Sequence, residues 1–464
     1  MTAVITQPSR TVRGSGAQGR TVLVAVLLAT FMGLLDAGIV TVAVPSIQRE
    51  LNASFGEVQF VSAGYTLAYA VGLVTGGRLG DLYGRRRMFL AGVVLFVLTS
   101  LACAAAPSAT ALTGARVLQG LSAAVMLPQV LSIIQDGFTG PVRATALGCY
   151  GATVGLASIA GQVVGGALLA WNPLHLGWRS AFLVNIPIGA VALAIAARTV
   201  PESRGTPARL DLPGAGLLAL ALVALLLPPV RGQGRPAVAI GLAAAAAALT
   251  LFALVERRQA NPLVPMRILA QRRMVRGLST VLAFYAGNAG FFLLLACHLQ
   301  SGIGQEPLGS GLVFTPLGIA FAVTSLTGRR LGSPVRGTIL MTIGLAGVLT
   351  VVLAAPESAQ AGWLLPALTL SGAGQGLVAA PLIGKVLAGV DPADAGAASG
   401  VLLTATQIAN AAGVALIGGL FAHALGTAPG SPTASFHDYV HATAVTVAAV
   451  LALAVVTGLL VRKS

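Results

Sequence analysis

The chain has 464 residues, of which 56% are hydrophobic and only 9% are charged, and its mean hydropathy is +0.88. Soluble domains carry roughly 25% charged residues, so this composition excludes an ordinary soluble protein and indicates a membrane protein with many spans. In a soluble chain the net charge of +15 would suggest a nucleic-acid partner. Here most basic residues lie between apolar segments, where they set topology and attract anionic lipids. We therefore expect membrane lipids, and no nucleic acid, as partners.

Apolar segments of about 20 residues, long enough to cross a bilayer as helices, recur from Val22 to the end of the chain. We predict an all-α polytopic fold with about 14 transmembrane helices. In chain order, the predicted spans are 22–44, 58–78, 88–106, 110–134, 146–169, 180–197, 212–227, 238–255, 277–299, 311–328, 338–355, 362–383, 397–422 and 441–460.

The basic residues between these spans predict the topology, because Lys and Arg gather in short cytoplasmic loops. With the N-terminus inside, most of the 28 basic residues fall on the inner side, and only Arg49, Arg179, Arg231 and Arg235 fall outside. We therefore expect a multi-pass protein of the plasma (inner) membrane with both termini cytoplasmic. Residues 1–20 are interpreted as a cytoplasmic tail before a retained first span, rather than as part of a signal peptide.

The two halves of the chain are similar to each other. The loop Gly76–Arg87 has a degraded copy at Thr327–Arg336, and the spans 146–169 and 397–422 are both rich in glycine. Paired halves around a central site are typical of secondary transporters. After the N-terminal tail 1–20, we predict an N-terminal six-helix bundle at 21–200, two inserted helices with flanking cytoplasmic loops at 201–276, a C-terminal six-helix bundle at 277–461 and a cytoplasmic C-terminus at 462–464.

Asp36 is the only acidic residue well inside a predicted span, where a carboxylate is costly and commonly functional. At about 1.5 Å per residue, Asp36 lies about 13 Å and Arg116 about 9 Å from the outer ends of their spans. Burial disfavours a charged carboxylate and a nearby arginine favours it. A changing distance between the two would therefore load and unload a proton. The alternative is a static ion pair that holds the two spans together.

Asp81 is an acid in an otherwise basic cytoplasmic loop that contains Arg85, Arg86 and Arg87. We expect these charges to latch one half of the protein to helix ends of the other half in the outward-facing state. Asp136, at the inner end of the span 110–134, is expected to join them. The alternative is that the arginines only set the topology.

The sequence does not favour an enzyme. No phosphate-cradling loop followed by Gly-Lys-Ser/Thr is present, which argues against ATP hydrolysis. Cys103, Cys149 and Cys297 lie in apolar segments without metal-ligand spacing. The five histidines lie near predicted outer loops, where solvated residues are expected: His175, His298, His423, His437 and His441. We expect no catalytic residue, no metal and no cofactor, with the proton as the coupling ion.

Several motifs carry a resemblance to a known family. The loop Gly77–Arg87 resembles the G-x-L-x-D-x-x-G-R-R signature of the major facilitator superfamily. Leu35–Pro45 is similar to the L-D-x-T-I-V-N-V-A-L-P motif of its fourteen-span drug/proton antiporter family. Further matches are Arg116–Gly120, the glycine series of span 146–169, and Trp178–Gly189. The resemblance covers nearly the whole chain in order, and it implies the major facilitator fold with two additional central helices.

The resemblance also implies roles for further residues. It extends the cytoplasmic latch, whose candidate members are Gly77, Asp81, Gly84, Arg85, Arg86 and Asp136. It also implies an antiporter motif in which close helix packing prevents a proton leak. The members of that motif are Gly155, Gly161, Gln162, Gly165 and Gly166.

The chain departs from the family pattern at four positions. Gly38 and Thr41 stand where the family has threonine and asparagine after the aspartate, and Leu82 replaces a basic residue. Gln162 stands where the family has proline. The missing proline is the main argument for import rather than export.

Polar and aromatic side chains within the spans are candidates for a central substrate cavity, with lipid contact or core packing as the alternative for each. These candidates are Tyr65, Tyr69, Gln119, Gln129, Phe284, Tyr285, Asn288, Phe291, Phe292, Gln375, Gln407 and Asn410.

These observations and the resemblance together predict a proton-coupled antiporter that exports small lipophilic or cationic organic compounds, such as drugs or antibiotics, by alternating access. Its partners would be a small organic substrate, protons and lipids, and we expect a functional monomer. One alternative is a proton-coupled importer of a small organic solute on the same scaffold. Another is a non-transporting membrane receptor or scaffold, which would need neither Asp36 nor paired halves.

Overall fold

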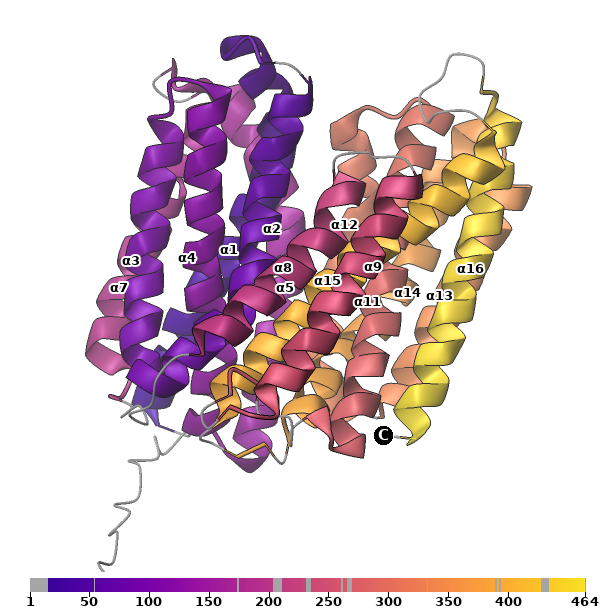
Figure 1. Ribbon diagram of the computed structural model, residues 1–464. Helices are drawn as coiled ribbons and strands as arrows, with labels where there is room; N and C mark the ends of the chain where they lie inside the picture. The colour runs from indigo at the N-terminus through magenta and orange to yellow at the C-terminus, as the bar shows by residue number, and fades with distance from the viewer. Residues whose placement is uncertain are drawn as a thin grey trace, which may run out of the picture.

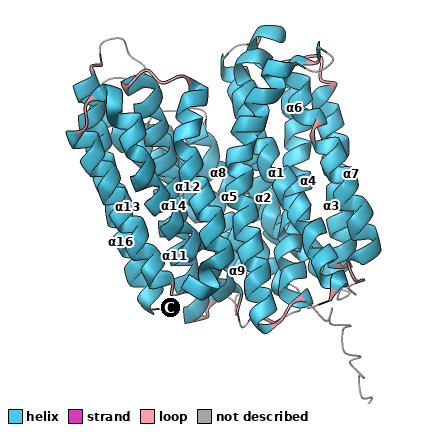
Figure 2. Ribbon diagram, turned by 180° about the vertical axis from the view of Figure 1, so that it is seen from behind, coloured by secondary structure: helices cyan, strands magenta, loops and turns pink. Residues whose placement is uncertain are grey.

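The computed structural model describes residues 16–53, 55–172, 175–202, 211–230, 235–259, 262–264, 269–331, 333–388, 390–391, 394–426 and 434–463. These residues form helices joined by short turns, and they contain no strand (Figure 2). The helices lie side by side and run roughly parallel or antiparallel to one another.

The helices are named in chain order. In the first part of the chain they are α1 (Ala17–Glu50), α2 (Phe55–Tyr83), α3 (Arg85–Ala104), α4 (Ala109–Gly137), α5 (Gly140–Trp171), the short η2 (Gly177–Arg179) and α6 (Ser180–Leu183), and α7 (Asn185–Thr199). In the second part they are α8 (Leu212–Val230), α9 (Arg235–Glu256), α11 (Arg272–Cys297), the π-helical η3 (His298–Gly302), α12 (Pro307–Leu331), α13 (Pro334–Ala354), α14 (Glu357–Leu387), α15 (Ala395–Leu425) and α16 (Phe436–Lys463).

Among the described residues, 11 helices are long and apolar enough to cross a membrane. Helices α2 and α5 coincide with two further predicted spans, and the apolar part of α8, Leu212–Leu225, is shorter than those 11. The predicted all-α, multi-pass membrane fold is therefore confirmed. The exact number of spans is not confirmed and stays a prediction.

Local signals in the sequence start several helices. The hydroxyl of Ser108 accepts the backbone N–H of Ala111 at 3.2 Å and caps α4. Ser333 caps α13 in the same way, and Pro334 occupies the first turn, where no backbone donor is needed. Such caps satisfy backbone groups at the helix ends, which lie near the membrane surface.

The helices form two groups that stand side by side (Figure 1). In the first group α4 packs between α2 and α3, and in the second group α14 packs between α12 and α13. The groups meet where α2 packs against α15 and where α5 packs against α12. If the second group repeats the first, α12 corresponds to α2 and α15 to α5, so the two crossings are equivalent. We call these two crossings the seam.

Glycine permits close approach at both crossings of the seam. A Cβ atom on Gly77 of α2 would overlap the backbone of Gly396 in α15. A Cβ atom on Gly148 of α5 would overlap the carbonyl group of Ser325 in α12. Small residues therefore bring the two groups into direct backbone contact.

Helices α8 and α9 pack against each other, and α8 also packs against α2 and α15. They slant across the junction of the two groups (Figure 1). This is the place expected of an inserted pair. The division into two six-helix bundles and an inserted pair remains our proposal.

His298 lies in the interior rather than in a solvated loop, contrary to the expectation for the histidines. It is fully buried, with Nε2 at 2.7 Å from Oε1 of Gln360 and Nδ1 at 3.0 Å from the hydroxyl of Thr443. The imidazole ring thus joins η3 to α14 and α16 within the second group.

Candidate functional site

Asp36 of α1 lies at the centre of a buried polar cluster in the first group, and its side chain is 0% exposed. Nη1 of Arg116 lies 2.5 Å from Oδ2 of Asp36. Nε2 of Gln119 donates to Oδ1 at 3.0 Å, and Nδ2 of Asn185 donates to the same oxygen at 2.7 Å. The structure thus brings the two predicted charges together and surrounds the carboxylate with donors from α4 and α7.

Arg116 has further contacts besides Asp36. Its Nε donates to the carbonyl oxygen of Val61 at 3.2 Å, and its Nη1 donates to Oε1 of Gln119 at 2.7 Å. The guanidinium carbon lies 4.2 Å from the centre of the Tyr65 ring, a cation–π contact. These partners remain for Arg116 when the charge on Asp36 is neutralised.

Helix α3 supports the cluster from behind. The hydroxyl of Ser100 accepts from Nε2 of Gln119 at 2.8 Å and from Nδ2 of Asn185 at 3.2 Å. The Cys103 thiol donates to Oε1 of Gln119 at 3.5 Å, so this cysteine does more than fill space. Among the described residues, Oδ1 of Asn185 has no hydrogen-bond partner although it is buried.

Sequence reasoning missed Asn185 as a site residue. It begins α7 directly after the turn at Val184 that separates α6 from α7. The available signal was a polar amide inside an otherwise apolar span, within the matched segment Trp178–Gly189.

The glycines of α5 lie on different surfaces. A Cβ atom on Gly161 would lie 2.8 Å from Cα of Gly38, and one on Gly165 would lie 3.2 Å from Cα of Ile39, so both glycines press α5 onto α1 next to Asp36. Gly155 faces Phe321 of α12, across the seam. Gly166 has no atom within 4 Å of its Cβ position. The side chain of Gln162 lies outside the described part of the structure.

A second cluster connects the two groups at the other end of α2. The buried carboxylate of Asp81 accepts the backbone N–H groups of Gly396 and Ala397 at 2.9 Å each, at the start of α15. Nη2 of Arg85 lies 3.3 Å from Oδ1 of Asp81, and Nη1 of Arg85 forms an ion pair with Asp136. The structure therefore brings together three predicted latch residues, and Asp81 among them binds the first turn of a helix from the other group, where the helix dipole favours an anion.

Of the remaining latch candidates, Gly77 packs against Gly396 of α15 in the other group, whereas Gly84 and Arg86 have local roles in the first group. Arg86 forms an ion pair with Glu202 and donates to the carbonyl oxygen of Ala197 at 2.6 Å. The hydrogen bond from Arg86 holds the pKa of the Glu202 carboxyl below its ordinary value. Gly84 has φ of 98°, a conformation that favours glycine, at the junction of α2 and α3.

Two further contacts between the groups were not predicted. Nε2 of Gln135 in α4 donates to the carbonyl oxygen of Leu387 in α14 at 2.5 Å. The hydroxyls of Ser132 in α4 and Ser399 in α15 lie 3.4 Å apart. Both contacts lie toward the same end of the helices as Asp81, so the two groups touch at that end.

The arrangement of paired helix groups, buried charge pair and latch agrees with a match to a family model. The model of the Major Facilitator Superfamily matches residues 26–414. The chain belongs to this superfamily. It is therefore a membrane transporter and not an enzyme.

Curated relatives and a solved structure extend this comparison. The chain is 38% identical over 429 residues to the "Probable actinorhodin transporter" of Streptomyces coelicolor, covering 89% of this chain and 74% of that one. It is 36% identical over 471 residues to the "Cephamycin export protein CmcT" of Amycolatopsis lactamdurans, covering 97% and 96%. The human organic anion transporter MFSD10 has the same fold, with a TM-score of 0.67, 16% identity and coverage of 96% and 100%.

Several residues predicted to line a central cavity instead form hydrogen bonds or ring contacts within one group of helices. Gln119 belongs to the Asp36 cluster, and Gln129 donates to the carbonyl oxygen of Gly76 at 2.8 Å. Gln375 is buried and donates to the hydroxyl of Ser371 at 3.2 Å. Nδ2 of Asn410 donates to Oε1 of Gln407 at 3.4 Å, and the ring centres of Phe292 and Phe314 lie 5.2 Å apart.

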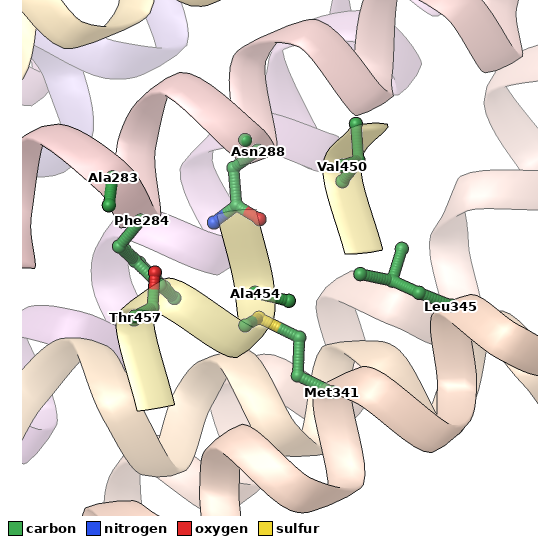
Figure 3. A pocket seen from close by; sticks show the side chains of 9 residues that line it. Ala283, Phe284, Asn288, Met341, Leu345, Val450, Ala454 and Thr457 are labelled. Atoms are coloured by element: carbon green, nitrogen blue, oxygen red, sulfur yellow. The ribbon is translucent and has the colours of Figure 1, made fainter. Parts of the chain in front are cut away.

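Asn288 lines a pocket inside the second group, between α11, α13 and α16 (Figure 3). Phe284, Met341 and Val450 line the same pocket, and the Asn288 amide points into it. Phe291, by contrast, is buried in the core of the second group.

Three tyrosines converge from the two groups. The rings of Tyr65 and Tyr69 on α2 stack with centres 6.1 Å apart. Tyr150 of α5, which sequence reasoning missed, lies within electrostatic reach of both Tyr69 and Tyr285 of α11. Tyr69 of α2, Tyr150 of α5 and Tyr285 of α11 are therefore neighbours at the junction of the groups. We call these three residues the tyrosine cluster, and no motif in the sequence indicates it.

Proposed function

We propose that this transporter is a proton-coupled antiporter that exports small lipophilic or cationic organic compounds by alternating access. The printed names of its relatives, an actinorhodin transporter and a cephamycin export protein, support export of organic compounds such as antibiotics. The single observation that carries the proton coupling is the buried contact of Asp36 with Arg116.

The donors around Asp36 suggest how a proton is exchanged. In the present geometry Arg116, Gln119 and Asn185 all donate to the carboxylate oxygens. A protonated Asp36 needs an acceptor instead. Rotation of the Asn185 amide would offer Oδ1, which is buried and unpartnered among the described residues. Asn185 therefore serves both protonation states, and the other partners of Arg116 keep that charge in place.

The substrate would bind at the tyrosine cluster between the groups. Tyr69, Tyr150 and Tyr285 offer aromatic faces and hydroxyls, which suit a lipophilic molecule with a few polar groups. The acidic residues of the sequence after residue 277 (Glu306, Glu357, Asp391, Asp394 and Asp438) lie at or near the ends of predicted spans. A neutral or monocationic substrate therefore fits better than a divalent cation.

The Asp81 latch would control which side of the transporter is open. It is engaged here, and the contacts between the groups at Gly77, Gln135 and Ser132 lie toward the same end. We assign this end to the cytoplasm of a cell with the protein in its inner membrane, both termini inside, and the present state to the outward-facing form. The contacts of the seam lie within one chain, so we propose a monomer as the functional unit.

One observation favours import as a second candidate. Gln162 replaces the family's proline in α5. The proline of the antiporter motif is therefore missing at that position. The alternative of a non-transporting receptor or scaffold is set aside, because the chain belongs to a superfamily of transporters.

The proposed function is tested by proton movement in everted membrane vesicles energised to an acid interior. Antiport predicts that a lipophilic antibiotic which is a substrate will collapse the pH gradient only in vesicles that contain the transporter. A symporter would instead dissipate the pH gradient only when its substrate is present inside the vesicles. Absence of any response across a broad panel, with folded protein in the membrane, would contradict the proposed function.

A further inference from the structure

A second buried acidic pair lies at the ends of α8 and α9, outside the site described above. Asp211 is 6% exposed and Glu256 is 2% exposed. A Cβ atom on Gly214 would lie 2.6 Å from Oε1 of Glu256 and closer still to Oδ2 of Asp211, so both oxygens face the same point. The Asp211 and Glu256 carboxyl groups therefore lie side by side.

Three of the four carboxyl oxygens already have donors. Oδ1 of Asp211 accepts the N–H of Gly214 at 2.9 Å and Nε2 of Gln259 at 3.4 Å. Oε1 and Oε2 of Glu256 accept the N–H groups of Leu263 at 3.2 Å and Val264 at 3.4 Å. Oδ2 of Asp211 is buried and has no donor among the described residues. A proton shared between this oxygen and Oε1 of Glu256 would supply the missing hydrogen bond.

No cation in the described part of the structure supplies the missing positive charge. Arg257 and Arg258 follow Glu256 but are exposed, and neither pairs with the acids. Helix α2 approaches this region at Val74. The charged residues of α2 that follow Val74 are Arg78 and Asp81, and neither contacts Asp211 or Glu256. The start of α11 carries exposed arginines, and the only titratable residue of α15 is His423, near its other end.

A metal ion fits the pair poorly. The backbone N–H groups point at three of the four oxygens, and a metal would have to displace them. The described residues contain no group of three or more metal-ligating side chains. Two carboxylates that share a buried site cannot both be charged without a large cost, and the usual solution is one shared proton.

We propose that Asp211 and Glu256 together bind one proton, as a carboxylic acid–carboxylate pair, and that this proton holds α8 and α9 closed over the seam. The link to the seam is the segment Leu263–Val264. Its N–H groups bind Glu256, and its side chains are buried in a cluster with Val74 of α2 and Phe252 of α9. Val74 lies one turn before Gly77 and also contacts α15 at Gly400.

The proton exchange balances simply. When the pair loses its proton to water, the O–H bond breaks and two adjacent carboxylates remain, which repel each other. The repulsion loosens the Leu263–Val264 segment from α2, while binding of a proton restores the shared hydrogen bond. This site is separate from Asp36, and its ability to bind a proton does not depend on the substrate or direction proposed above.

The direct test is infrared spectroscopy of the purified full-length protein in the Asp36→Asn background, titrated from about pH 6 to about pH 10. We expect a carboxylic acid C=O band that disappears as the pH rises, and the band should be absent in Asp211→Asn and Glu256→Gln. The exposed acid Glu357 is the matched control, and Glu357→Gln should keep the band. Absence of a titrating band before substitution, or its persistence in both pair variants, would overturn the proposal.

Asp211→Asn is expected to fold, because its amide keeps the acceptor for Gly214 and donates to Glu256 in place of the proton. This variant therefore removes the shared proton while keeping the fold, so an effect seen in it is due to the proton. Hydrogen exchange at Leu263 and Val264 should accelerate with pH about tenfold more in the parent protein than in Asp211→Asn, as expected from loss of one hydrogen bond to a charged group. Equal acceleration in the two proteins would show that the proton does not hold this segment.

Discussion

Asp36 is surrounded by donors, and the amide of Asn185 is the shortest neutral contact among them at 2.7 Å. Removal of this amide takes a donor from the charged carboxylate and an acceptor from the protonated acid, and the hydrogen bond to the charged group is the stronger of the two. The consequences at the scale of single residues therefore concern the pH at which the transporter loads its proton.

Asn185→Ala should shift the pH profile of proton-driven transport toward alkaline pH. A hydrogen bond to a charged group contributes about 1.5–3 kcal/mol and a neutral one about 0.5–1.5 kcal/mol, so the midpoint should rise by about one pH unit. The measurement is the initial rate of transport against pH in vesicles. Asn288→Ala, which changes an amide in the pocket of the second group, is the control and should leave the midpoint in place. An unchanged midpoint in Asn185→Ala would remove Asn185 from the proton site.

At this scale the sequence was informative about charges and poor about neutral polar residues. Asp36, Arg116 and Asp81 were predictable because a charge in or next to an apolar span is costly and therefore conspicuous. Asn185 and Tyr150 were not, because an amide or a phenol is tolerated in many positions of a span. Only the packing of α7 against α1 and of α5 against its neighbours reveals what they contact.

At the scale of helices, α5 presses on α1 next to the proton site through Gly161 and Gly165. Gly161→Ala would place a methyl group 2.8 Å from Cα of Gly38 and force the helices apart. We expect a loss of about 1–3 kcal/mol in stability, seen as a lower unfolding temperature of the purified protein, together with slower transport. Gly166→Ala has no neighbour within 4 Å and should behave as the unsubstituted protein. Equal behaviour of the two variants would argue against a tight α1–α5 contact.

The latch is a contact between the end of one helix and the start of another. Asp81→Ala removes the acceptor of the Gly396 and Ala397 N–H groups. Each hydrogen bond to a charged group contributes about 1.5–3 kcal/mol, so the inward-facing population should increase at least about tenfold. Spin labels at the exposed residues Tyr83 and Val275 would report this as longer distances between the two groups.

Glu202→Gln is the matched control for the latch. It removes an acid at the same end of the protein that pairs only with Arg86 and Arg87 of its own group. Its distance distribution should stay unchanged. A similar shift in both variants would mean that the charge of this region, rather than the contact with α15, sets the conformation.

The existence of the helices was largely predictable from apolar length, but their interruptions were not. The turn at Val184 lies inside the predicted span 180–197, three residues before Pro187, and the π-helical η3 begins at the end of the predicted span 277–299, so apolar length alone marks neither of them.

At the scale of the whole molecule, the charge bias of the loops predicts that both termini lie in the cytoplasm. The measurement is a pair of fusions after Ser464, one to a reporter that is active only outside the inner membrane and one to a fluorescent protein that matures inside. We expect an inactive first reporter and a fluorescent second one. The reverse result would require an odd number of spans or an inverted N-terminus.

The pairing of the two groups was predictable only in outline. Duplicated motifs indicated two halves, and the glycines of the predicted span 146–169 indicated close helix packing. That α2 meets α15 and α5 meets α12 follows from long-range packing, which a single sequence does not display. The same holds for the position of α8 and α9 across the seam.

The central claim is that the charge of Asp36 couples proton movement to transport. It is tested most directly in proteoliposomes that contain Asp36→Asn, by comparing uphill transport driven by a pH gradient with exchange of labelled for unlabelled substrate without a gradient. We predict that uphill transport falls to background while exchange continues, because the substrate site and the latch are intact. Uphill transport at the rate of the unsubstituted protein would contradict the claim and leave the contact of Asp36 with Arg116 as a static ion pair.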